Sequence, residues 1–332
     1  MLGKRIMELR KKRGISLEDM SSRSGIDAQL LQRVERGETR SLDTRQIIAI
    51  CDTLDLKRST DYANLLNLHR LPTKFKCYRV GLLQSGSKST TLMFDKNYRS
   101  RNEFMGLKSC EAIVGYLQNR LSRKKLCDFV LQRDCQGHLE LDSAFFLHYF
   151  LDILIEHFGF SKVIFNIRDC YSWLNCMINF VLNHRLQNRQ FFSMIQFGVT
   201  QCFVRDKPGM IKKMPQLINR MLAFWSTENQ RILEILPTGR SLVVRTHEIY
   251  EKIDDIANFL EIPVESLDRE STLAFPKEID HGVLHQLDYH FLKAMFDEYC
   301  TPLMEKYFPN YTLDDFLSGN YMTDIKIFRD ET

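Results

Sequence analysis

The chain has 332 residues, of which 44% are hydrophobic and 27% are charged, and this ordinary globular balance excludes a wholly disordered or fibrous protein. No apolar run approaches the roughly 18 residues needed to cross a bilayer, and the first residues are charged throughout, so we expect a cytoplasmic protein with no membrane contact. The nine cysteines include no CxxC pair and fit neither a disulfide framework nor a zinc site, so we expect no metal.

The net charge of +4 is small but unevenly distributed along the chain. Residues 1–70 hold 14 Lys and Arg against 10 Asp and Glu, whereas the remainder holds 32 of each kind. The whole positive excess therefore lies in the first fifth of the chain. This asymmetry indicates that the amino-terminal end meets a polyanion.

Residues 2–56 are predicted to form several short helices joined by tight turns, because apolar residues recur there at helical spacing. Ser16 and Asp27 have the residue types of helix N-caps, and Gly25 and Gly37 are placed to end helices. Residues 44–54 supply a further helix. The pattern predicts a small all-helical unit.

After a polar linker at residues 57–76, the hydrophobic pattern changes to short apolar runs that each lead into a helical stretch. Strands that alternate with helices predict a parallel sheet flanked by helices, hence an α/β fold. We expect two domains, 1–70 and 71–332. The predicted strands are residues 78–83, 163–167 and 241–245, and the clearest helices are residues 144–158, 171–185, 211–236 and 251–260.

Residues 15–37, ISLEDMSSRSGIDAQLLQRVERG, resemble the helix-turn-helix of the Cro and phage-repressor type. In that arrangement the second helix enters the major groove of DNA and presents its first polar residues to base edges. The resemblance implies DNA contact through Gln29, Gln32 and Arg33, because Gln suits adenine and Arg suits guanine or phosphate. The alternative is that this unit packs on the other domain or dimerises, so that its fold serves protein contact.

The segment from Tyr78 to Met93, YRVGLLQSGSKSTTLM, is a strand-like run followed by a short polar loop and a helix start. Exposed loop amides and a helix N-terminus favour an anionic group. The Walker pattern GxxxxGK(S/T) is absent. An ordinary strand-to-helix turn remains the alternative for this segment taken alone.

Two later segments extend this pattern. One strand-like run ends in Arg168 and Asp169 before a helix, and another, at residues 241–245, precedes a helix that ends in FLEIP at residues 259–263. In this order and spacing the three blocks, over about residues 78–310, resemble the sulfotransferase family that uses 3′-phosphoadenosine-5′-phosphosulfate (PAPS). The resemblance implies a P-loop-like parallel sheet flanked by helices.

The resemblance also implies two groups of cofactor-binding residues. The loop would bind the 5′-phosphosulfate, and Arg168 and Cys176 would lie at the 3′-phosphate, where the planar fork of an arginine suits phosphate. Gln84 stands where the family commonly has Arg or Lys, and Cys176 stands where it has Ser. The implied loop residues are Ser85, Gly86, Ser87, Lys88, Ser89 and Thr90.

The implied reaction is sulfuryl transfer from PAPS to a small-molecule hydroxyl or amine acceptor, which releases adenosine 3′,5′-bisphosphate. Lys88 would stabilise the developing charge, and a carboxylate, Glu103 or alternatively Asp142, would take the acceptor proton. We prefer Glu103.

A different class of function is also open: a DNA-binding transcriptional regulator whose sulfotransferase-like domain senses a nucleotide or mediates dimerisation, which Gln84 and Cys176 favour. A P-loop enzyme such as a nucleotide kinase is disfavoured because the Walker ending is missing. The acceptor is not specified by the sequence, and neither is the oligomeric state, although a homodimer is possible.

Overall fold

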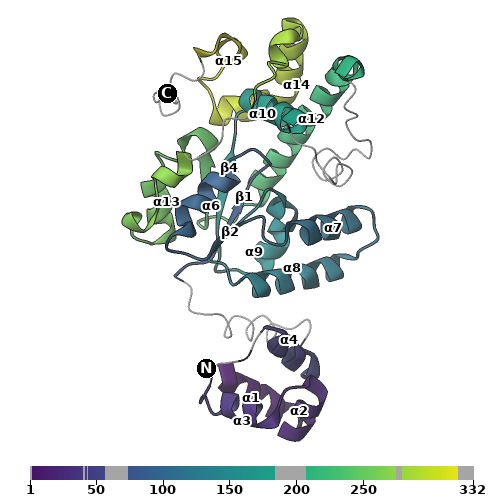
Figure 1. Ribbon diagram of the computed structural model, residues 1–332, viewed down its shortest axis with the longest axis vertical. Coiled ribbons are helices and arrows are strands. Elements are labelled where there is room, and N and C mark those ends of the chain that lie inside the picture. Colours follow the sequence, from purple (N-terminus) through teal and green to yellow (C-terminus); the bar gives the residue numbers. More distant parts are fainter. Residues whose placement is uncertain are drawn as a thin grey trace. The chain divides into compact units, whose positions relative to one another are not determined.

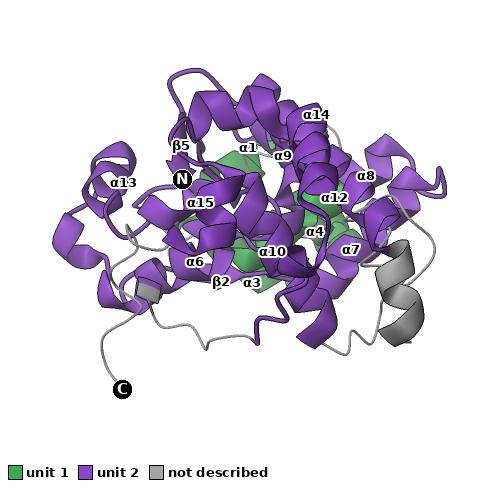
Figure 2. Ribbon diagram, turned by 90° about the horizontal axis from the view of Figure 1, so that it is seen from above, with its two compact units in different colours: residues 1–73, 128–138 green, residues 74–127, 139–332 purple. Residues whose placement is uncertain are grey.

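The structure, a computed structural model, describes residues 2–39, 42, 44–56, 74–183, 207–273 and 279–320. Its contacts divide the chain into two compact units, which Figure 2 distinguishes by colour. Unit 1 comprises Met1–Thr73 and Asp128–His138, and unit 2 comprises Lys74–Cys127 and Leu139–Thr332. Residues 57–73, where the domain boundary at residue 70 falls, lie outside the described residues, so that boundary stays a prediction.

The amino-terminal part of unit 1 consists of helices whose ends are set by the expected capping residues. Ser16 accepts a hydrogen bond from the Asp19 amide, and Asp27 accepts one from the Leu30 amide. Gly25 adopts the left-handed conformation that ends a helix without a Cβ penalty. The helices are α1 Leu2–Lys12, α2 Leu17–Ser24, α3 Ala28–Glu35 and α4 Thr44–Thr53.

Close packing of α1 against α3 fixes the position of α3. A Cβ built on Gly3 would lie only 1.7 Å from the Val34 carbonyl oxygen, so only glycine allows this approach. Arg10 on α1 forms a bidentate pair with Glu35 on α3, with both N···O distances 2.7 Å. The apolar core around these contacts includes Ile6, Leu9, Met20, Leu31, Val34, Ile47 and Ile50.

Unit 2 is built on a five-stranded sheet whose neighbouring strands all pair in parallel, in the order β2-β3-β1-β4-β5. This confirms the predicted α/β fold with helices flanking a parallel sheet. The strands are β1 Cys77–Val80, β2 Ser100–Asn102, β3 Leu141–Ser143, β4 Lys162–Ile167 and β5 Ser241–Arg245.

Helices cover both faces of this sheet. Figure 1 shows α6 (Ser87–Asp95) and α13 (Ile253–Leu260) on one side of it, and α9 (Leu151–His157) and α12 (Lys207–Ile235) on the other. The prediction of one helix over 144–158 was wrong in detail, because a 3-10 helix, η1 (Phe145–Phe150), precedes α9. The remaining helices are α7 Gly106–Leu117, α8 Arg123–Gly137, α10 Cys170–Asn183, η2 Thr246–Glu248, η3 Val264–Ser266, η4 Glu270–Leu273, η5 Leu284–Gln286, α14 Tyr289–Tyr307 and α15 Leu313–Ser318.

The strand order creates a switch point between β1 and β4. The chain leaves β1 toward β2 on one side of the sheet, and leaves β4 toward β5 on the other. In open α/β sheets, ligands bind beyond the carboxyl ends of the strands at such a point. The polar loop that follows β1 and Arg168, which follows β4, both lie there.

Candidate functional site

The loop between β1 and α6, residues 81–86 (the β1–α6 loop), has its carbonyl groups bonded to the body of unit 2. Every carbonyl from Leu83 to Ser87 accepts a hydrogen bond from a side chain of this unit. The donors, in chain order of the carbonyls, are Trp173 Nε1 to Leu83 at 2.8 Å, Arg168 Nη1 to Gln84 at 3.0 Å, Arg79 Nη2 to Ser85, Thr90 Oγ1 to Gly86 at 3.0 Å, and Ser143 Oγ to Ser87 at 3.0 Å.

The hydrogen bonds to these carbonyls determine the direction in which the amides of this loop point. In a trans peptide the C=O of one residue and the N–H of the next point in opposite directions, and the described residues contain no cis peptide. The amides of Gly86 and Ser87 follow bonded carbonyls and have no acceptor in the described part of the chain. Ser87 also opens α6, where the first amides lack intrahelical partners. These N–H groups can therefore receive an anion.

The backbone of the β1–α6 loop depends on glycine at two positions. A Cβ on Gly81, whose φ is +147°, would lie 2.4 Å from the backbone oxygen of Asn166 on β4. A Cβ on Gly86, whose φ is +87°, would lie 2.5 Å from the Ile249 side chain. Gln84 also has a positive φ of 64°, a conformation that non-glycine residues seldom adopt.

Arg168 is half-buried and lies against this loop. Besides its bond to the Gln84 carbonyl, its Nε donates to Ser172 Oγ at 2.8 Å. The backbone carbonyl of Arg168 accepts from Trp225 Nε1 at 3.0 Å. Cys176 lies one turn beyond Ser172 on α10 and is also half-buried. The structure thus brings Arg168 to the loop, and the side chain beside it is Ser172.

Glu103 follows β2 and is tied to the same loop through Ser143. The Glu103 amide donates to the Ser143 carbonyl at 2.8 Å, and the Ser143 hydroxyl donates to the Ser87 carbonyl. Burial raises the pKa of the Glu103 carboxyl. A carboxylate with a raised pKa is better matched to proton transfer near neutral pH. Asp142, the other candidate base, is buried within β3.

The remaining predicted loop residues differ in exposure. Ser85 and Thr90 are buried, Ser89 is half-buried, and Lys88 is exposed. Thr90 also donates to Asn166 Oδ1 at 3.2 Å. Beyond the end of β5, His247 bonds Tyr311 through Nε2 at 2.8 Å, and burial lowers the pKa of His247.

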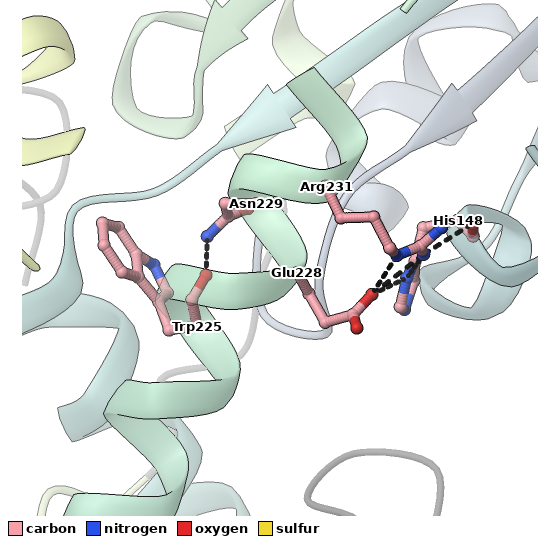
Figure 3. Close-up of polar contacts among 5 residues, drawn as sticks. All are labelled: His148, Trp225, Glu228, Asn229 and Arg231. Atoms are coloured by element: carbon pink, nitrogen blue, oxygen red, sulfur yellow. Dashed lines mark hydrogen bonds and ion pairs between the residues drawn. The ribbon is translucent and has the colours of Figure 1, made fainter. Parts of the chain in front are cut away.

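The long helix α12 holds the ends of two strands. Trp225 on α12 bonds the Arg168 carbonyl after β4, and Glu228 and Arg231 reach His148 on η1, which follows β3. Figure 3 shows this cluster. The Glu228 carboxylate accepts from His148 Nδ1 at 3.1 Å and from Arg231 Nε at 2.9 Å, and Arg231 Nη2 donates to the His148 carbonyl at 2.9 Å.

Burial and the hydrogen bonds and charges within this cluster together set its titration. Burial raises the pKa of Glu228, but the bonds from His148 and Arg231 outweigh it and bring the pKa to about 2. His148 is fully buried, and burial lowers its pKa. At neutral pH the Glu228 carboxylate is therefore ionised, and it lies between His148 Nδ1 and the Arg231 guanidinium.

On unit 1, the side chains predicted to contact DNA lie together on α3. Gln29, Gln32 and Arg33 are exposed, whereas Leu31 and Val34 of the same helix are buried. Lys11, Lys12 and Arg13, at the end of α1, are also exposed. The exposed face of α3 that carries Gln29, Gln32 and Arg33 therefore presents polar and basic side chains, while its core residues lie on another face.

Comparison with known proteins identifies the fold of this unit. Residues 6–60 match the family model described as Helix-turn-helix. The amino-terminal helices form a helix-turn-helix domain. In the helix-turn-helix domain, α2 and α3 are the two helices of the motif, and Gly25 begins the turn between them. No curated protein matches the chain's sequence.

Among solved structures, the crystal structure of sulfotransferase STF9 from Mycobacterium avium is similar to the chain at 13% identity and a TM-score of 0.41. The match covers 86% of this chain and 95% of that one. Across the described residues, no helix combines the length and hydrophobicity required to cross a membrane.

Three side chains that hold the site were missed from the sequence. Arg79 and Asn166 are in strands, where a polar residue gives no sign of its partners, and Ser172 is one of many serines. The one available signal was an arginine at the third position of a buried strand, because an arginine is almost never fully buried without a partner.

Proposed function

We propose that unit 2 is a PAPS-dependent sulfotransferase that transfers a sulfuryl group to a hydroxyl or amine acceptor. The observation that carries this proposal is that the Ser85 and Gly86 carbonyls are hydrogen-bonded by Arg79 and Thr90, which directs the amides of Gly86 and Ser87 away from these donors, with Arg168 bonded to the same loop. An amide cradle next to an arginine suits a nucleotide that carries anionic groups at two positions.

In the proposed reaction the cradle binds the phosphosulfate end of the donor and Arg168 binds its 3′-phosphate. A bond forms between the acceptor oxygen or nitrogen and sulfur, while the bond from sulfur to the bridging oxygen of the nucleotide breaks. The amides of Gly86 and Ser87, with Lys88, stabilise the charge that develops on that bridging oxygen. Glu103 takes the acceptor proton, so that protons and charge balance when adenosine 3′,5′-bisphosphate leaves.

Binding of adenosine 3′,5′-bisphosphate to the full chain by isothermal titration calorimetry tests the nucleotide site. Arg168→Ala should weaken binding at least tenfold, because it removes a charge-assisted contact to phosphate. Arg120→Ala, at an exposed arginine, is the matched control and should leave affinity unchanged. Absence of binding, or equal affinity of the Arg168→Ala variant and the wild type, would contradict the proposal.

Transfer of radiolabelled sulfate from PAPS to a panel of alcohols, phenols and amines tests the reaction. Glu103→Gln should lower transfer at least a hundredfold and leave nucleotide affinity within about twofold, because the amide cannot accept the proton. Full activity of Glu103→Gln would assign the base to another residue. Tight nucleotide binding without transfer to any acceptor would favour a sensor.

A second function is supported by the helix-turn-helix domain. We propose that it binds DNA with α3 in the major groove, because Gln29, Gln32 and Arg33 are exposed together there. Gel-shift assays with genomic fragments at moderate salt test this. The double variant Gln29→Ala and Arg33→Ala should lose the shifted band, whereas Gln118→Ala with Arg120→Ala should keep it. No shifted band for the wild type would instead favour a role in protein contact.

A further inference from the structure

Arg79 is a fully buried cation in the central strand of the sheet. Its side chain, on β1, has 0% exposure. Nε donates to Asn166 Oδ1 at 2.6 Å and Nη2 donates to the Ser85 carbonyl, while Nη1 is buried and has no partner in the described part of the chain. Arg79 therefore satisfies only part of its donor capacity within the protein.

Both partners of Arg79 are neutral, so neither supplies a counter-charge. Burial alone lowers the pKa of Arg79, to about 9, and no described carboxylate raises it. The guanidinium is therefore still charged at neutral pH. A buried charge without an opposite charge is strongly destabilising unless something compensates it.

The guanidinium lies directly beneath the β1–α6 loop. A Cβ built on Gly81 would be 3.1 Å from Nη2 and 3.4 Å from Cζ of Arg79. Nη2 bonds the carbonyl of the Ser85–Gly86 peptide, whose N–H points to the opposite side of the loop. The Arg79 cation and an anion bound to the Gly86 amide would thus lie on opposite sides of the Ser85–Gly86 peptide. Both would polarise this peptide in the same direction, so each would strengthen the hydrogen bond of the other.

We propose that Arg79 is the buried counter-charge for an anion seated on the amides of Gly86 and Ser87, so that the site selects ligands by the negative charge they bring to that end. Arg79 does not touch the ligand and acts as a positioning residue through the Ser85–Gly86 peptide. This proposal rests on the proposed function only in taking the ligand to contain adenosine. That the ligand is an anion is inferred from the buried charge of Arg79 and the amides of the β1–α6 loop.

A purely structural role of Arg79 would have different consequences from a role as counter-charge. If Arg79 only held the Ser85 carbonyl in place, its loss would weaken the affinity for all ligands equally. A counter-charge should add affinity only to ligands that carry an anionic group at the loop, by tenfold or more, the order expected for charges roughly 7 Å apart across a peptide.

The first experiment measures calorimetric affinities of the full chain for adenosine 3′-phosphate, adenosine 3′,5′-bisphosphate and inorganic pyrophosphate. In Arg79→Met, the affinity gained from the 5′-phosphate and the affinity for pyrophosphate should each fall at least tenfold, while adenosine 3′-phosphate binds within about twofold of wild type. Arg79→Lys should restore most of the loss. Equal losses for all three ligands, or no rescue by lysine, would overturn the proposal.

A second variant leaves Arg79 in place in case Arg79→Met does not fold. Asn166→Asp puts a carboxylate at the atom that already accepts from Nε. It should raise the melting temperature of the ligand-free protein and reduce the further rise caused by pyrophosphate. Because the substitution also removes the donation from Asn166 Nδ2 to the Val244 carbonyl, the deciding measurement is the further rise with pyrophosphate, and a rise as large as that of the wild type would overturn the proposal.

These outcomes separate the two proposals. If pyrophosphate binds in an Arg79-dependent way and neither adenosine nucleotide binds, the PAPS function fails and the counter-charge stands. If the bisphosphate binds and transfer occurs with no dependence on Arg79, the function stands and the counter-charge fails. If no anion binds the wild-type chain, both fail.

Discussion

The two candidate sites of this chain are built in opposite ways. In the helix-turn-helix domain the proposed contacts are exposed side chains on α3, and the residues that stabilise the domain lie on other faces. In unit 2 the proposed contacts are backbone amides, and their direction is set by buried side chains that also hold the sheet together. Binding and stability should therefore be separable in the first region and coupled in the second.

The largest effect is expected for Gly81→Ala in unit 2. A methyl group there meets the Asn166 backbone oxygen at 2.4 Å with φ at +147°, so steric overlap and backbone strain add. We expect a loss of about 4 kcal/mol in the free energy of unfolding, measured by urea denaturation with circular dichroism. Gly239→Ala is the control, because it also has a positive φ but nothing within 4 Å, and it should cost about 1 kcal/mol. Equal losses of unfolding free energy in the two variants would contradict the proposed coupling of binding and stability at the β1–α6 loop.

Glu228→Gln should cost up to about 3 kcal/mol near neutral pH and should flatten the acid dependence of stability. Because folding lowers the pKa of Glu228 from 4.5 to about 2, its stabilisation is complete above pH 4.5 and is lost as pH falls toward 2. Urea denaturation at pH 7, 5 and 3 measures this. Glu234→Gln, at an exposed position on the same helix, should keep the wild-type profile.

In the helix-turn-helix domain, Arg10→Ala should cost about 2 kcal/mol, because it leaves the Glu35 carboxylate largely buried without its bidentate partner. Arg5→Ala removes an exposed pair with Glu8 and should cost less than about 1 kcal/mol. Thermal denaturation followed by circular dichroism compares the two. A similar small loss in both would show that the helix α1 to α3 contact does not depend on this pair.

The smallest effect is expected for Arg33→Ala, which should change the free energy of unfolding by less than about 0.5 kcal/mol while it weakens DNA binding. Arg33 is exposed and lies outside the core. Denaturation and DNA titration of the same variant test whether the two properties separate. A loss of stability comparable to that of Arg10→Ala would remove the contrast between the two regions.

Local sequence signals predicted much of the fold. Cap residues, turn glycines and apolar spacing predicted α2 and α3 closely, and continuous apolar runs located β1, β4 and β5. The strands β2 and β3 were not predicted, because each has only three residues and its pairing is decided by the neighbouring strand.

The sequence indicated the backbone part of the candidate site but not the side chains that hydrogen-bond to that backbone. The loop sequence indicated an amide cradle, and the strand order placed Arg168 beside it. Which side chains bond the loop carbonyls depends on contacts between residues up to 90 positions apart, such as Trp173 and Leu83. No periodicity in the sequence encodes such pairs. The assignment of Cys176 to the 3′-phosphate stays a prediction.

The chain's two tryptophans have a practical consequence. Trp173 bonds the Leu83 carbonyl in the β1–α6 loop and Trp225 bonds the Arg168 carbonyl, so each indole reports on one half of the candidate site. Residues 1–73 contain none. The intrinsic fluorescence of the unlabelled protein should therefore change when an anion binds at the sheet and should not change in response to events confined to the helix-turn-helix domain.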